Sequence, residues 1–148
     1  MPRILIIDDI YGVAGSARKD FCLLCKLIDV TDEDRPHAVI DDPIAEAVFC
    51  SAQNRNGSSV ENSVAVAIDA IRKGWDGEPD KRWALILLDL RFVAGPVGKD
   101  GEPIGLPDDD SFGFRILEKI FEVFGSDLPV IVMSARNRRD VIGDVVDK

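Results

Sequence analysis

The sequence lacks two features that would define large classes of protein: long apolar runs and an excess of positive charge. No apolar stretch approaches the roughly 18–20 residues that a membrane-spanning helix needs. The 27 Asp and Glu residues outnumber the 18 Lys and Arg residues, which gives a formal net charge of −9. Phosphate backbones are bound through clustered basic residues. The one basic cluster, at residues 136–139, is too short for that purpose, so we expect neither a membrane protein nor direct nucleic-acid binding.

Cysteine and histidine are also scarce. The three cysteines, Cys22, Cys25 and Cys50, form an odd set, and no secretory signal precedes the first strand-like run. We therefore expect free thiols and a cytoplasmic protein. Cys22 and Cys25 form a CxxC motif, but no second CxxC or nearby histidine completes a zinc site, so packing is the favoured role. The single histidine, His37, lies in an irregular acidic stretch and is expected at the surface.

The chain does have short apolar runs that alternate with helical patterns. Four short apolar runs indicate strands, and the first and third, which end in acids, are typical of strands buried on both faces. The four runs span residues 3–8, 45–52, 83–89 and 128–133.

Helical periodicity follows each of these runs. The first helix is predicted near 12–28, the second after a capping box formed by Ser58 and Glu61 and ending near Gly74, and the fourth over 136–146. The third begins at Ser111. The predicted inward face of the first helix is Val13, Ala17, Phe21, Leu24 and Ile28, and that of the third is Phe114, Leu117, Ile120, Phe121 and Phe124.

This alternation predicts a single α/β domain over residues 1–148, with a parallel sheet and helices on both of its faces. In such sheets the ligand site lies at the carboxyl ends of the strands. The polar residues at those ends are therefore the candidates for function.

Four such residues follow the predicted strands: Asp8 and Asp9 after the first, Asp89 at the end of the third, and Ser134 after the fourth. Three carboxylates close together repel one another, and a hard cation such as Mg²⁺ relieves this repulsion. An aspartate can also attack a phosphoryl group to form an aspartyl phosphate. Asp89 suits that role, Asp8 and Asp9 suit the metal, and the Ser134 hydroxyl suits a hydrogen bond to the phosphoryl oxygens.

These segments, in this order, resemble the response-regulator receiver domain of two-component signalling. The resemblance rests on Ile-Asp-Asp at 7–9, Leu-Leu-Asp-Leu at 87–90, Phe-Gly-Phe-Arg-Ile-Leu at 112–117, Leu-Pro-Val-Ile at 128–131 and Val-Met-Ser-Ala at 132–135. It implies a flavodoxin-like, doubly wound sheet and a phosphoprotein that acts in phosphorelay signal transduction rather than as an enzyme.

The resemblance also implies specific roles for residues. Mg²⁺ would be bound by Asp9, Asp89 and the backbone carbonyl of Arg91, with Asp8 assisting. Asp89 would accept the phosphoryl group from a histidine kinase or phosphotransfer protein, and Ser134 would supply the switch hydroxyl.

Two departures from the family pattern matter. The family has a fifth strand followed by a lysine, whereas this chain stops at Lys148, so we expect strand order 2-1-3-4 without the fifth strand and a chain that is part of a longer protein. The exposed fourth strand would then support a homodimer. Insertions are expected at about 29–44 and 92–111, the latter serving as a lid, a partner surface or a tolerated surface loop.

Other functions remain open at this point. The missing lysine leaves room for a degenerate receiver-like interaction module that does not switch by phosphorylation. A haloacid-dehalogenase-type phosphatase would need an acid two residues after Asp8, where Ile10 stands. A dinucleotide-binding enzyme would need a glycine-rich turn where Asp8 and Asp9 stand.

Overall fold

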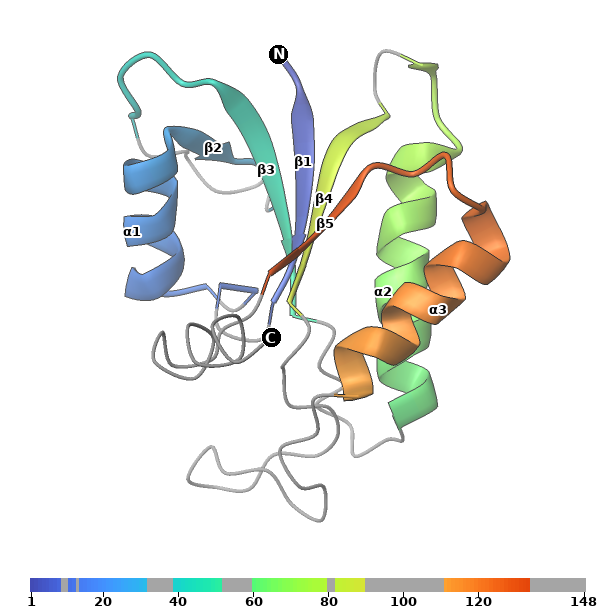
Figure 1. Cartoon of the computed structure of the whole chain (residues 1–148). Coiled ribbons are helices and arrows are strands. Elements are labelled where there is room, and N and C mark those ends of the chain that lie inside the picture. Colours follow the sequence, from blue (N-terminus) through green and yellow to red (C-terminus); the bar gives the residue numbers. More distant parts are fainter. Residues whose placement is uncertain are drawn as a thin grey trace, which may run out of the picture.

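The computed structural model describes residues 1–8, 11–12, 14–31, 39–51, 60–79, 82–89 and 111–133. These residues form an α/β fold around a five-stranded sheet in which every neighbouring pair of strands is parallel. Helix α1 covers one face of the sheet, and α2 and α3 cover the other (Figure 1). The predicted α/β class is therefore confirmed, with helices on both faces. Its elements are β1 (Arg3–Ile7), α1 (Ser16–Cys25), β2 (Leu27–Asp29), β3 (Ala45–Cys50), α2 (Val60–Trp75), β4 (Trp83–Asp89), α3 (Ser111–Phe124) and β5 (Val130–Met133).

The strand order is β2-β3-β1-β4-β5. The first, second, third and fourth predicted strands are β1, β3, β4 and β5, and they lie across the sheet in the order β3-β1-β4-β5. The predicted sheet of four strands in the order 2-1-3-4 is nevertheless wrong, because a further strand, β2, is present at the edge beside β3. Strand β2 has three residues and directly follows α1 through Lys26, whose φ of 54° ends the helix. So short a strand leaves no alternating pattern, and its residues continue the apolar run that predicted a longer helix.

The two predicted insertions differ in how much of them the structure describes. Strand β2 ends at Asp29, where the predicted insertion 29–44 begins, and residues 29–31 and 39–44 of that insertion are described. The predicted insertion 92–111, apart from Ser111 at the start of α3, and the predicted helix 136–146 lie outside the described residues.

The face covered by α2 and α3 contains the larger core. Its buried side chains come from β1, β4 and both helices: Leu5, Ile7, Ala67, Ile68, Ile71, Trp83, Ile86, Leu88, Ile116, Ile120 and Leu128. The Trp83 indole N–H donates a 2.8 Å hydrogen bond to the carbonyl oxygen of Ile71. Helix α2 ends at Trp75, which confirms the predicted end near Gly74. A Cβ at Gly74 would collide with the Trp83 ring, so the glycine also admits the indole against the last turn of the helix.

The predicted inward face of α3 is wrong at two positions. Phe114 and Phe121 are 50% and 56% exposed, whereas Ile116, which was not predicted to face inward, is buried together with the correctly predicted Ile120. The predicted face and the face through Ile116 both have helical spacing and share Leu117, so the periodicity of apolar residues alone did not distinguish them. Ile116 and Ile120 pack in the core against the sheet, and the two phenylalanines face outward.

The face covered by α1 contains a smaller core, made by Ile6, Cys22, Leu27, Ala45, Ala47 and Phe49. The predicted inward positions of Ala17 and Leu24 are wrong, because both side chains are exposed, Leu24 to 84%, and Arg18 and Cys22 are buried instead. All three cysteines are free thiols, as predicted, and Cys22 packs in the core. Burial, followed by the nearby charge of Asp29, raises the pKa of the Cys22 thiol to about 11.

Strand β5 pairs with β4 and ends the described sheet on the side opposite β2. Its Ile131 and Val132 are 52% and 40% exposed. The homodimer expected through this strand stays a prediction. Within the described ranges, no helix is long and apolar enough to cross a membrane.

Candidate functional site

Asp8 and Asp89 lie side by side at the carboxyl end of the two central strands. The register pairs Ile7 of β1 with Leu88 of β4, so Asp8 and Asp89 are the next residues on adjacent strands. Neighbouring strands lie about 4.8 Å apart. Asp8 is 3% exposed and Asp89 fully buried, which is rare for carboxylates in proteins. The structure thus brings together two of the predicted site residues.

The other predicted site residues, Asp9, Arg91 and Ser134, lie outside the described residues. Strand β5 ends at Met133, which pairs with Asp89, so β5 flanks the site on the side opposite β1. In the described part of the chain, no three acidic, cysteine or histidine side chains gather closely enough to bind a metal. The two described carboxylates have the oxygen-donor chemistry that Mg²⁺ requires.

The chain after Asp8 folds back on that residue. The backbone N–H of Tyr11 donates to Asp8 Oδ1 at 3.0 Å, and the N–H of Gly12 donates to the Asp8 carbonyl oxygen at 2.9 Å. The Asp8 N–H donates in turn to the carbonyl oxygen of Cys50 at the end of β3. A Cβ on Gly12 would collide with the Asp8 carbonyl and the Ser51 backbone, so only glycine fits here.

A buried arginine holds this turn from the helix side. The Arg18 Nε–H donates to the carbonyl oxygen of Tyr11 at 2.8 Å, and Nη2 donates to that of Gly12. Its Nη1 pairs with Asp29 Oδ2 at 3.3 Å. The guanidinium lies 4.8 Å from the centroid of the Phe49 ring, in cation–π contact. Arg18 is 8% exposed, so its charge is buried, while Tyr11, Gly12 and Asp29 are half-buried.

Asp29 of β2 anchors this arginine to the edge of the sheet. Its Oδ1 accepts a 2.9 Å hydrogen bond from the Thr31 N–H, while the Thr31 hydroxyl accepts one from the Phe49 N–H. Burial raises the pKa of Asp29, but hydrogen bonds from Thr31 and the charge of Arg18 outweigh it and leave the pKa below its ordinary value of 3.8. Asp29 therefore stays ionised as the counterion of Arg18.

Aromatic rings support the same turn. The rings of Tyr11 and Phe21 stack with centroids 4.5 Å apart, and Phe21 meets Phe49 edge-on at 6.3 Å. The turn after Asp8 is thereby fastened to both α1 and β3. Because backbone hydrogen bonds, Arg18 and the aromatic rings all hold this turn, the position of Asp8 beside it is fixed.

Sequence reasoning missed Arg18, Gly12 and Asp29. A signal for Arg18 was present, because Arg18, Phe21, Cys22 and Cys25 have the i, i+3, i+4, i+7 spacing of one helix face. The predicted face through Leu24 is more apolar than this one. The charge of Arg18 argues against burial of its face unless a partner for the charge is known. The partner comes from a strand that the sequence did not predict.

The arrangement combines a rigid polar turn with two buried carboxylates at the edge of a parallel sheet. Such carboxylates can bind a hard cation, and one of them can act as a nucleophile. No family model matches the chain, and neither a curated protein nor a solved structure matches it.

Proposed function

We propose that this chain is a phosphoacceptor domain of the receiver type, in which Asp89 accepts a phosphoryl group with the help of Mg²⁺. The observation that carries the proposal is the pairing of Asp8 and Asp89, both buried, on adjacent central strands at the carboxyl end of the sheet. Folding alone gains nothing from two neighbouring buried carboxylates, because like charges in such a place repel.

The finer fold that we propose is the flavodoxin-like, doubly wound one. The order β3-β1-β4-β5 within the sheet and the placement of α1 opposite α2 and α3 support it. In this fold the ligand site lies at the strand ends next to the point where the strand order reverses, which here is β1 and β4.

The proposed step is a displacement at phosphorus. A carboxylate oxygen of Asp89 forms the new P–O bond as the bond to the donor breaks, and the donor leaves with the electron pair. Asp8 and Asp89, together with Asp9 and the Arg91 carbonyl, would hold Mg²⁺, which would supply positive charge to neutralise the transferred group. The turn hydrogen-bonded to Asp8 keeps its carboxylate oriented. Ser134 then hydrogen-bonds to the phosphoryl oxygens, and the donor in the cell is a histidine kinase or phosphotransfer protein.

The test is phosphorylation of the purified chain by acetyl phosphate with Mg²⁺, followed by intact mass spectrometry. We expect one added phosphoryl group that base removes and acid does not. Asp89→Asn should abolish it, and omission of Mg²⁺ should reduce it strongly. Asp69→Asn is the matched control, because Asp69 is an exposed aspartate on α2, and it should behave as the wild type.

A phosphoryl group added equally to the wild type and to Asp89→Asn would sink the proposal. If the wild type binds Mg²⁺ in an Asp8-dependent way but takes no phosphoryl group, the chain is instead a receiver-like interaction module.

A further inference from the structure

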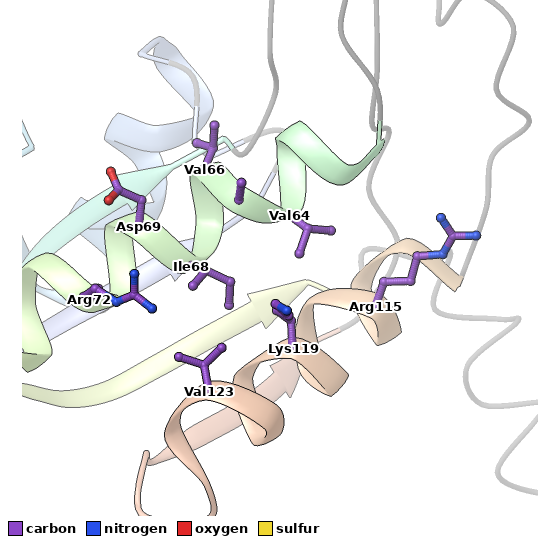
Figure 2. Close-up of a pocket in the computed structure, with 9 residues that line it drawn as sticks. Val64, Val66, Ile68, Asp69, Arg72, Arg115, Lys119 and Val123 are labelled. Carbon is purple, nitrogen blue, oxygen red and sulfur yellow. The ribbon is translucent and has the colours of Figure 1, made fainter.

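A groove of about 860 Å³ runs between α2 and α3 on the outer surface of the molecule. Two rows of side chains line it, Val64, Ile68 and Arg72 from α2, and Arg115, Lys119 and Val123 from α3 (Figure 2). Each row has i, i+4, i+8 spacing, so each wall spans about 12 Å at 1.5 Å per residue. That length corresponds to a little over two turns of a helix laid along the groove.

The lining combines apolar and cationic side chains. Val64, Ala65, Ile68 and Val123 contribute apolar surface. Arg72 and Arg115 lie at opposite ends of the groove, with Lys119 between them (Figure 2). This grouping of cations is notable in a chain whose net charge is −9.

The two arginines are available to a ligand. Neither guanidinium makes an ion pair with another described residue. Lys119 is partly committed, because its ammonium lies 3.1 Å from Glu122. Asp69, the one acid that lines the groove, already pairs with Lys73 at 3.5 Å.

We propose that this groove binds an acidic amphipathic helix of a partner protein. An apolar groove flanked by charge is the usual receptor for such a helix, which inserts residues at i, i+3, i+4 and i+7. Glutamate or aspartate on the flanks of the helix would pair with Arg72 and Arg115, whose planar guanidinium groups bind carboxylates in a bidentate manner. The proposal does not depend on the phosphoacceptor function.

The test is fluorescence anisotropy of the full chain with a labelled helical peptide of about four turns, carrying leucine at i, i+3, i+4 and i+7 and glutamate on both flanks. Two further peptides serve as controls: one with lysine in place of glutamate and one with serine in place of leucine. We expect saturable binding of the acidic peptide, and binding at least about tenfold weaker for either control.

Paired charge reversals locate the site. Arg72→Glu combined with Arg115→Glu should weaken binding of the acidic peptide by about tenfold or more. Lys19→Glu combined with Lys26→Glu changes the net charge equally but touches exposed residues at α1, outside the groove, and it should change binding by less than about twofold. Unchanged urea unfolding midpoints show that both variants are folded.

Several outcomes would overturn the proposal. These are equal weakening by the two double variants, equal binding of the lysine peptide, and no binding of the acidic peptide at millimolar concentration. Binding of anionic phosphatidylglycerol vesicles that is lost with Arg72→Glu/Arg115→Glu, without binding of the peptide, would assign the groove to a lipid surface instead.

Discussion

The two faces of the sheet differ in what they bury. Beneath α2 and α3, the buried side chains form an apolar core that includes Ile71, Ile86 and Ile120. Beneath α1 the core is smaller and is crossed by a buried cation, Arg18, with its counterion Asp29. The buried polar residues of the described chain are Asp8, Arg18 and Asp89.

The two faces of the sheet therefore contribute differently to stability and to the candidate site. Burial of apolar surface contributes about 25 cal/mol per Å², so the α2/α3 face supplies most of the stabilisation available from burial. A buried ion pair contributes little net stability, because desolvation offsets attraction, but it fixes geometry. The α1 face is therefore the one that orients the turn beside the candidate site.

The largest effect on stability is expected on the α2/α3 face. Ile120→Ala removes a fully buried side chain and should lower the free energy of unfolding by about 2–5 kcal/mol. Phe121→Ala, at the next position of the same helix, should cost less than about 1 kcal/mol, because that ring faces solvent. Urea unfolding of both variants measures the contrast, and equal losses would contradict the placement of α3.

Substitution of Arg18 on the α1 face is expected to reduce stability less than Ile120→Ala does, but to reduce phosphorylation activity more than a mild change at Ile120 does. Arg18→Met removes the donors to the Tyr11 and Gly12 carbonyl oxygens and should cost about 1–3 kcal/mol. It should also slow the phosphorylation of Asp89 by acetyl phosphate more than Ile120→Val does. Arg18→Lys should restore only part of the rate, because an ammonium cannot match the guanidinium geometry. If the phosphorylation rates of Arg18→Met, Arg18→Lys and Ile120→Val simply follow their stabilities, Arg18 has no orienting role.

The ion pair on the α1 face also predicts a pH dependence. The pKa of Asp29 in the folded chain is below 3.8, so its interactions stabilise the fold above that pH and are lost as pH falls through the folded pKa. The difference in unfolding free energy between wild type and Asp29→Asn should therefore be larger at about pH 6 than at about pH 2. Asp69→Asn, in an exposed pair on α2, is the control and should show little dependence. A constant difference for Asp29→Asn would show that its charge is unimportant.

The smallest effect concerns the thiols. Cys22 is buried with a pKa of about 11, whereas Cys25 in the same helix is half-buried. Alkylation requires the thiolate, so iodoacetamide at about pH 8 should modify Cys22 at least roughly tenfold more slowly than Cys25. Peptide mapping by mass spectrometry gives both rates. Comparable rates would mean that α1 opens readily and that its core is looser than described.

The sequence predicted the central strands well and the helix faces poorly. Strands such as residues 83–89 are buried on both sides, so their apolar runs are unambiguous. The inward faces of α1 and α3 each had two phases compatible with helical spacing, and only contact with the sheet selects one. Asp8 and Asp89 were predictable because parallel strands bring their ends to one edge. Arg18 was not, because its partner Asp29 lies in a three-residue strand.

The close packing of Gly12 against the Asp8 carbonyl and the Ser51 backbone has a consequence for finding relatives of this chain. A side chain at this position would push apart the ends of β1 and β3, so distant homologues that retain the site should retain glycine four residues after the first aspartate. A search pattern built on Asp8, Gly12 and Arg18 at their present spacing, with Asp89 at a variable distance after the first insertion, would follow the geometry of the site. It should recover relatives whose surface residues have diverged too far for overall sequence similarity to be visible.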